Sequence, residues 1–245
     1  MSRAQHADAR DRPVEQGVVG RALSTIARAF AVLLLSLAFS ILFEWIGMTF
    51  FWSDEGSLHS REMLASDISF LNDDFRLSVM TSSPARFATR FANLFYHYLF
   101  EATGFIDFIH WIQAPPSVDD SSIRITLRTV YATIADYIVA AITITQVFAV
   151  RLAVLTLSLP VFVLFGLVGI TEGLVQRDLR RWGGGRESSF LYHHAKRWVW
   201  PSFLAAWLVY LSIPWSVHPN FVVMPFGALF ATSLAVTSAT FKKYL

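Results

Sequence analysis

The longest segment without a turn signal, residues 123–182, constrains the fold most strongly. It ends at three consecutive glycines, 183–185, and Arg151 is the only charged residue among positions 137–171. The 20 residues 152–171 are uncharged and long enough to cross a bilayer core of about 30 Å as a helix. The segment therefore predicts one long helix whose second half spans a membrane.

The preceding residues, 123–150, are predicted to continue the same helix outward. Small and polar residues recur there at spacings of three and four, namely Thr126, Thr129, Thr133, Asp136, Ala140 and Thr143. An opposing apolar stripe consists of Ile123, Leu127, Val130, Ile134, Ile138 and Ala141. Such two-sided periodicity is typical of a helix with one packed face.

A two-span hairpin with Arg151 at its tip is the alternative. It requires a sharp reversal, but residues 148–154 contain no Gly, Pro or Asn that would favour one. One long helix is therefore preferred. Pro160 has no backbone N–H and leaves the carbonyl of Thr156 without its helical partner, which predicts a kink.

A basic stretch follows this helix, from Thr171 to Arg197. It carries six basic residues against three acids, the basic ones being Arg177, Arg180, Arg181, Arg186, Lys196 and Arg197. Short loops rich in Lys and Arg remain in the cytoplasm, so this stretch predicts the orientation of the whole chain. The three glycines should end the preceding helix in the left-handed cap conformation.

This stretch also resembles a known family. The runs E-G-L-V-Q-R-D-L-R-R, G-G-G-R-E-S-S and Y-H-H-A-K-R are similar to the signature loop of membrane proteins encoded by bacterial integrating conjugative elements. The genes of that family tend to lie beside a TraD-type coupling ATPase, and the family has no established mechanism. The resemblance implies a role in conjugative DNA transfer.

Composition supports a membrane protein independently. The chain has 54% hydrophobic residues, 16% charged residues and a mean hydropathy of +0.47, which is too apolar for an ordinary soluble domain of 245 residues. It contains no Cys, which excludes disulfides, thiolate metal sites and cysteine nucleophiles.

The N-terminal region predicts a tail followed by a first span. An arginine-containing polar tail, residues 1–25, precedes an apolar run over residues 26–51 with no small-residue cleavage site. We therefore expect an uncleaved signal anchor with its N-terminus inside. Glu44 near its outer end is interpreted as snorkelling to the interface; the alternative is an ion path or partner site.

Residues 52–150 are predicted to form a helical region outside the membrane. Residues 57–75 read as a polar helix, and Pro84 can open a second helix that continues to Ile112. This second helix is expected to lie on the outer membrane surface, or alternatively in a soluble bundle. His97 and Glu101 have metal-ligand spacing, but no third ligand is in reach and no metal site is expected.

The C-terminal part predicts two further spans joined by an outer turn at residues 214–220. Trp198 and Trp200 are placed at the inner interface, and Tyr210 and Trp215 near the outer one. Small residues recur every four positions in the last helix and allow close helix packing, with a shorter version in the second span. These packing candidates are Gly227, Ala231, Ala235 and Ala239, together with Gly169 and Gly173.

The motifs do not favour catalysis. Neither G-x-S-x-G nor H-E-x-x-H is present, and G-G-G-R-E-S-S lacks the spacing and Lys of a phosphate loop. We therefore expect neither an enzyme nor a cofactor. A channel or transporter subunit is the alternative function, with Glu44, Asp136 and Arg151 as candidate pathway charges, although no inverted repeat is visible.

The resulting expectation is an all-α polytopic protein of the bacterial inner membrane, with four transmembrane helices, a helical periplasmic insertion and both termini cytoplasmic. Its segments are a tail at 1–25, spans at 26–51, 151–173, 198–215 and 221–241, a periplasmic region at 52–150 and a basic loop at 174–197. The resemblance implies a non-catalytic scaffold or adaptor of a type IV secretion-like conjugation apparatus.

Expected partners are membrane lipid, the coupling ATPase, other conjugation proteins and further copies of the chain, without direct nucleic-acid binding. Candidate partner-binding residues are Arg177, Arg180, Arg181, Arg186, Tyr192, His193 and His194.

Overall fold

The computed structural model describes residues 18–73, 81, 83–115, 122–183 and 189–241. These residues form helices and contain no strand, which confirms the predicted all-α class. The helices are α1 (Val18–Phe50), α2 (Leu58–Asp73), α3 (Pro84–Tyr96), the π-helix η1 (His97–Glu101), α4 (Phe105–Gln113), α5 (Ser122–Leu157), α6 (Leu159–Trp182), α7 (Ser189–Ser212) and α8 (Asn220–Ala239). The chain divides into two units, residues 1–36 and 37–245, so the boundary falls within α1.

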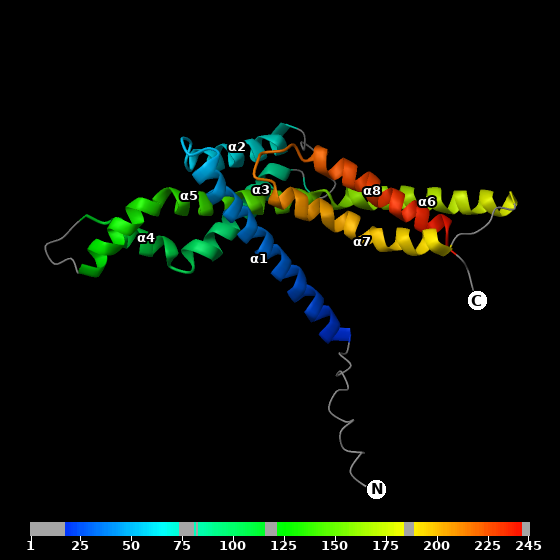
Figure 1. The fold of residues 1–245 in the computed structure, drawn as a ribbon, viewed down its shortest axis with the longest axis horizontal. Helices are drawn as coiled ribbons and strands as arrows, with labels where there is room; N and C mark the ends of the chain where they lie inside the picture. Colours follow the sequence, from blue (N-terminus) through cyan, green and yellow to red (C-terminus); the bar gives the residue numbers. More distant parts are fainter. Residues whose placement is uncertain (1–17, 74–80, 82, 116–121, 184–188, 242–245) are drawn as a thin grey trace, which may run out of the picture. The chain divides into compact units, whose positions relative to one another are not determined.

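The long helical segment is present as α5 followed directly by α6, and Figure 1 shows the two helices in line. Only Ser158 separates them. Its N–H donates to the carbonyl of Val154 at 2.9 Å, and its own carbonyl accepts from the N–H of Val161 at 3.0 Å. The chain does not reverse at Arg151, so the hairpin alternative is wrong. The interruption at Ser158 lies two residues before Pro160, and Pro160 has no backbone N–H to donate to the preceding turn.

Helix α8 packs against both α6 and α7. A Cβ atom added at Gly169 would overlap the backbone of Ala231, and one added at Gly173 would overlap that of Ala235. The two pairs advance by four residues on each helix, so α6 and α8 run parallel. Close approach of this kind requires small residues on both surfaces.

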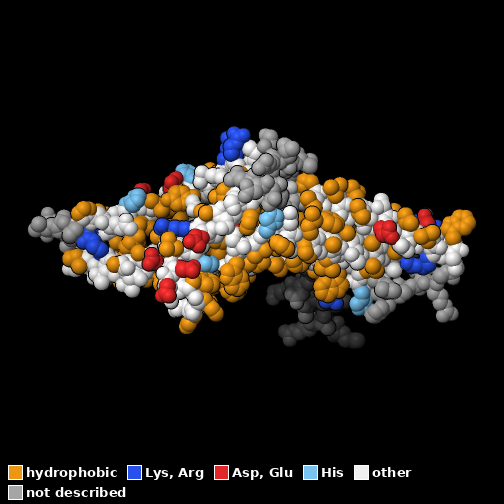
Figure 2. All heavy atoms as spheres, turned by 90° about the horizontal axis from the view of Figure 1, so that it is seen from above, with side chains coloured by type: hydrophobic (Ala, Val, Ile, Leu, Met, Phe, Trp, Pro, Cys, Tyr) orange, Lys and Arg blue, Asp and Glu red, His pale blue; other side chains and the backbone are white. Residues whose placement is uncertain are grey.

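Helices α2, α3 and α4 pack around α5. Residues 84–112 do not form the single predicted helix, because η1 and a turn at Gly104, with φ of 74°, separate α3 from α4. Ala88 and Ala92 of α3 are buried, and α3 packs on α5. Figure 2 shows acidic and histidine side chains gathered over this part of the chain.

Three helices among the described residues are long and apolar enough to cross a membrane: Ala22–Phe50, the combined α5–α6 segment Ser122–Trp182, and Asn220–Ala239. They are consistent with a membrane protein. Helix α7 is not one of the three, because its first half carries Tyr192, His193, His194, Lys196 and Arg197.

The end of α6 differs in detail from expectation. Gly183 follows the last residue of the helix, but its φ of −83° and ψ of 3° are not left-handed. Its N–H donates to the carbonyl of Leu179 at 3.0 Å, which continues the helical pattern by one residue. Gly184 and Gly185 lie outside the described residues.

The contact between α6 and α8 predicts which substitutions destabilise the protein. Ala231→Phe should overpack against Gly169 and cost about 1–3 kcal/mol of the free energy of unfolding. Ala228→Phe is the matched control, because Ala228 is exposed on another face of the same helix. Thermal unfolding in detergent measures both variants, and equal stability of the two would contradict this packing.

Candidate functional site

The most unusual side chain of the protein is Arg151, which lies within α5 and is only 1% exposed. Its helical neighbours Val150 and Leu152 are apolar and buried as well. A charged group in such surroundings is strongly destabilising unless an opposite charge and hydrogen-bond acceptors surround it.

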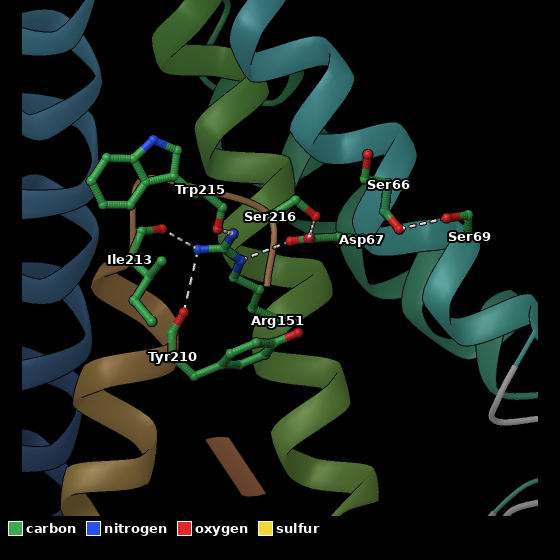
Figure 3. Close-up of polar contacts among 8 residues, drawn as sticks. All are labelled: Ser66, Asp67, Ser69, Arg151, Tyr210, Ile213, Trp215 and Ser216. Atoms are coloured by element: carbon green, nitrogen blue, oxygen red, sulfur yellow. Dashed lines mark hydrogen bonds and ion pairs between the residues drawn. The ribbon is translucent and has the colours of Figure 1, made fainter. Parts of the chain in front are cut away.

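Arg151 has those partners, as Figure 3 shows. Its Nε donates to Oδ2 of Asp67 at 2.7 Å, and Nη2 donates to the carbonyl of Trp215 at 2.7 Å. Nη1 donates to the carbonyls of Ile213 at 2.5 Å and Tyr210 at 3.3 Å. The guanidinium carbon also lies 5.5 Å from the centre of the Tyr210 ring, within the range of a cation–π contact.

Asp67, on α2, is the only charged partner of Arg151 among the described residues and is equally buried. Its second oxygen, Oδ1, accepts a hydrogen bond of 2.5 Å from the hydroxyl of Ser216. Burial raises the pKa of the Asp67 carboxyl, whereas the charge of Arg151 and the hydrogen bond from Ser216 oppose this change. We call Arg151, Asp67, Tyr210, Ile213, Trp215 and Ser216 the arginine hub.

The hub joins three parts of the chain that are distant in sequence. The carbonyl of Tyr210 lies in the last turn of α7 and that of Ile213 follows the helix directly. Carbonyls at a helix C-terminus lack intrahelical donors, and the helix dipole there favours a cation. Arg151 supplies those donors from α5. Asp67 and Ser216 then connect α2 to the turn between α7 and α8. The arrangement fastens helices together.

The hub is not evident from the sequence. There Arg151 reads as a hairpin tip or a pathway charge and Tyr210 as an aromatic residue near the outer interface, whereas in the structure both are buried in one cluster. The available signal lay in α2, where Ser60, Met63, Asp67 and Leu71 recur at spacings of three and four and are all buried. A carboxylate on a buried helix face needs a cation nearby to neutralise it, and Arg151 is a cation within an apolar segment.

The interpretation of Glu44 as a snorkelling side chain is wrong. Glu44 is 1% exposed, and both of its oxygens lie within 3.2 Å of Nδ1 of His59 on α2. The His59 ring stacks on Trp52 with ring centres 4.1 Å apart. The carboxylate therefore connects α1 to α2 rather than reaching the interface.

The candidate pathway charges do not come together. Glu44 pairs with His59, Arg151 is enclosed in the hub, and Asp136 is exposed on α5. His97 and Glu101 form an exposed pair, with Nδ1 and Oε2 2.8 Å apart. No group of three metal-ligating side chains occurs among the residues that the structure describes.

The predicted partner-binding arginines differ from one another in their surroundings. Arg180 is partly buried, and its Nη1 donates to the carbonyl of Ala239 at 3.3 Å, so it binds the C-terminal end of α8. Arg177 lies 3.6 Å from the carboxylate of Asp178. Arg181 is exposed and lines an open cavity together with Asp178 and Trp182. Arg186 lies outside the described residues.

The aromatic and histidine candidates lie on the first turns of α7. Tyr192 contacts Phe241 with ring centres 5.9 Å apart, and the amino group of Lys196 lies 5.8 Å from the Tyr192 ring. His193 and His194 are exposed. The start of α7, the end of α8 and the end of α6 therefore meet at one end of the three-helix group.

The hub predicts a characteristic pattern of stability changes. Asp67→Leu should cost roughly 3–5 kcal/mol, because it leaves the guanidinium buried without its counter-charge. Arg151→Met combined with Asp67→Leu removes both charges and should recover only part of that loss, since three carbonyls remain without a donor. Thermal unfolding in detergent measures the series.

Arg177→Met is the matched control for this series, because its ion pair with Asp178 is partly exposed and should contribute little. If Asp67→Leu and Arg177→Met were equally stable, the hub would have no dominant role in stability.

Comparison with known proteins identifies a family for this chain. No curated protein and no solved structure matches the chain. One family does match, described as IncC plasmid conjugative DNA transfer protein DtrJ-like, over residues 51–242. This range contains the arginine hub and helices α2 to α8. Because the match covers most of the 245 residues, the chain belongs to the DtrJ-like family of conjugative DNA transfer proteins.

Proposed function

We propose that this protein is a non-catalytic scaffold of the conjugation apparatus, anchored in the inner membrane by four helices. The observation that carries the proposal is the arginine hub, in a family of conjugative DNA transfer proteins. The buried charges of Asp67 and Arg151 pair with each other and hold helices together. Buried polar contacts that join helices suit a rigid membrane scaffold.

The packing of α6, α7 and α8 supports a fourth span. Helices α6 and α8 run parallel, because Gly169 lies against Ala231 and Gly173 against Ala235. If both cross the same membrane in the same direction, the chain between them must cross back. Helix α7 can do so, because its start contacts the end of α8 through Tyr192 and Phe241, and Phe203 contacts Phe230 along its length.

Charge supports an orientation with the ends of α6 and α8 in the cytoplasm. Arg177, Arg180 and Arg181 cluster at the C-terminal end of α6, and such positive ends remain inside. Trp182 is 92% exposed there and suits a membrane interface. The hub then lies at the outer end of the spans, and α2, α3, α4 and the part of α5 before Arg151 lie outside.

The cytoplasmic end offers a surface for an acidic partner. Arg181 is exposed, and His193 and His194 are exposed on α7. We propose that these residues dock an acidic surface of a TraD-type coupling ATPase near its membrane anchor. Arginine forks bind carboxylates in a bidentate manner, whereas lysine acts as a point charge. Arg180 instead serves the fold through its bond to Ala239.

Topology can be tested with single cysteines, since the chain has none of its own. Trp215→Cys, at the outer turn, should react with a membrane-impermeant maleimide added to spheroplasts. Gly183→Cys should react only after the membrane is permeabilised. Reaction of the two positions from the same side would reject a spanning α7.

The docking surface can be tested by substitutions that preserve charge. Arg181→Lys should lower copurification of the coupling ATPase and conjugation frequency while protein level stays unchanged, because lysine lacks the bidentate fork. Arg177→Lys is the control on the same helix. Full copurification and transfer by Arg181→Lys would eliminate specific docking and leave attraction to anionic lipid as the role of this cluster.

A further inference from the structure

Polar contacts hold the C-terminal end of α1, and one of them can gain or lose a proton. Nε1 of Trp45 donates to the carbonyl of Tyr137 at 2.9 Å, and the hydroxyls of Thr49 and Tyr137 lie 3.2 Å apart. Indole and hydroxyl groups stay neutral near neutral pH. The third contact is different, because it joins the carboxylate of Glu44 to the imidazole of His59 on α2.

The burial of Glu44 distinguishes this contact from a surface ion pair. Glu44 is 1% exposed, and Nδ1 of His59 lies 3.1 Å from one of its oxygens and 3.2 Å from the other. A buried carboxylate is strongly destabilising without an opposite charge, and His59 is the only cationic partner of Glu44 among the described residues. The side chain of His59 is 17% exposed, so water can supply and remove its proton.

Trp52 gives the His59 ring a second contact, of a kind that suits a cation. Its indole stacks on the His59 ring with centres 4.1 Å apart and 22° between the planes, and the face of an indole attracts cations. Gly47 makes this position possible, because a Cβ atom there would overlap the Trp52 ring. The N–H of Trp52 also donates to the carbonyl of Gly47 at 2.9 Å, so the chain after α1 folds back onto its last turns.

The other charged side chains around the pair do not replace His59. Glu55, in the turn after α1, carries a negative charge that opposes the charge on the buried carboxylate. The carboxylate of Asp136, on α5, lies against the same turn. The nearest charged neighbours of His59 along α2, Arg61 and Glu62, are both exposed. His59 therefore determines whether the buried carboxylate has a counter-charge.

We propose that Glu44 and His59 form a proton-dependent latch that holds the C-terminal end of α1 on α2. An imidazole loses its positive charge between about pH 5 and about pH 8, and two groups in such close contact titrate as one unit. While the pair holds a proton, carboxylate and imidazolium compensate each other. When the proton leaves, a buried carboxylate faces a neutral ring, and separation of the helices restores its hydration.

The sign of the pH dependence follows from this. Because the closed pair keeps a proton that the separated groups release, its contribution to stability is present at acid pH and is lost as pH rises. The latch depends only on contacts at the end of α1. It requires neither the proposed number of spans nor the docking of an ATPase.

An exposed pair of the same residue types provides an internal comparison. Nδ1 of His97 and Oε2 of Glu101 lie 2.8 Å apart, with 57% and 49% of the two side chains exposed. Water solvates both groups whether or not the ring is charged, so this pair should contribute little at any pH. Burial, rather than the residue types, makes the Glu44–His59 pair depend on a proton.

Thermal unfolding in detergent between about pH 5.5 and about pH 8 tests the latch. The midpoint of the parent protein should fall as pH rises. His59→Gln keeps a hydrogen-bond donor but carries no charge, so its midpoint should be lower than that of the parent at acid pH and should change less with pH. His97→Gln is the matched control and should reproduce the parent profile. Equal profiles of the parent and His59→Gln would overturn the latch.

Thiol labelling follows α1 directly, because the chain has no Cys of its own. Met48→Cys places a thiol one turn after Glu44, where the native side chain is 5% exposed, whereas Phe50 is 77% exposed and Phe50→Cys serves as the reference. The ratio of the two labelling rates removes the effect of pH on the thiol itself. The ratio should rise with pH in the parent and stay constant when Glu44→Gln is added, since the amide has no charge to compensate. A constant ratio in the parent, or an equal rise with Glu44→Gln, contradicts the proposal.

Discussion

The need to neutralise one buried cation determines how the rest of the structure is arranged. Arg151 carries a permanent charge in the middle of an otherwise apolar stretch of α5. The cost of burying it unpaired exceeds any single packing contact in the protein, so the chain must bring acceptors to it. The guanidinium pairs with Asp67, which lies 84 residues away in sequence. It also donates to three carbonyls at the end of α7 and in the following turn.

Two different kinds of contact therefore hold α6, α7 and α8 together. At one end of α7, the hub couples electrostatics to the unsatisfied carbonyls of a helix terminus. Along α6 and α8, Gly169 and Gly173 allow the two backbones to approach closely, which brings more atoms into van der Waals contact. Arg180 repeats the first kind of contact at the far end, on the last carbonyl of α8. Contacts at both ends therefore join the three helices into one packed group.

The exposed charged groups of this framework differ from the buried ones. Arg181, His193 and His194 are exposed where the end of α6 meets the start of α7. Arg151, Asp67 and Glu44 are each only 1% exposed and pair within the chain. The buried charges therefore hold helices together, whereas the exposed ones face the surroundings of the protein.

The sequence alone determined the all-helical class, the long α5–α6 helix and the place of its interruption, because periodicity, apolar length and Pro160 act locally along the chain. It also singled out the small residues that meet between α6 and α8. Only the tertiary structure decided the pairing of Asp67 with Arg151 and of Glu44 with His59, and the division of residues 84–112. A charge in a sequence shows that it needs a partner, but which partner is near depends on how helices distant in sequence pack, and that packing is cooperative.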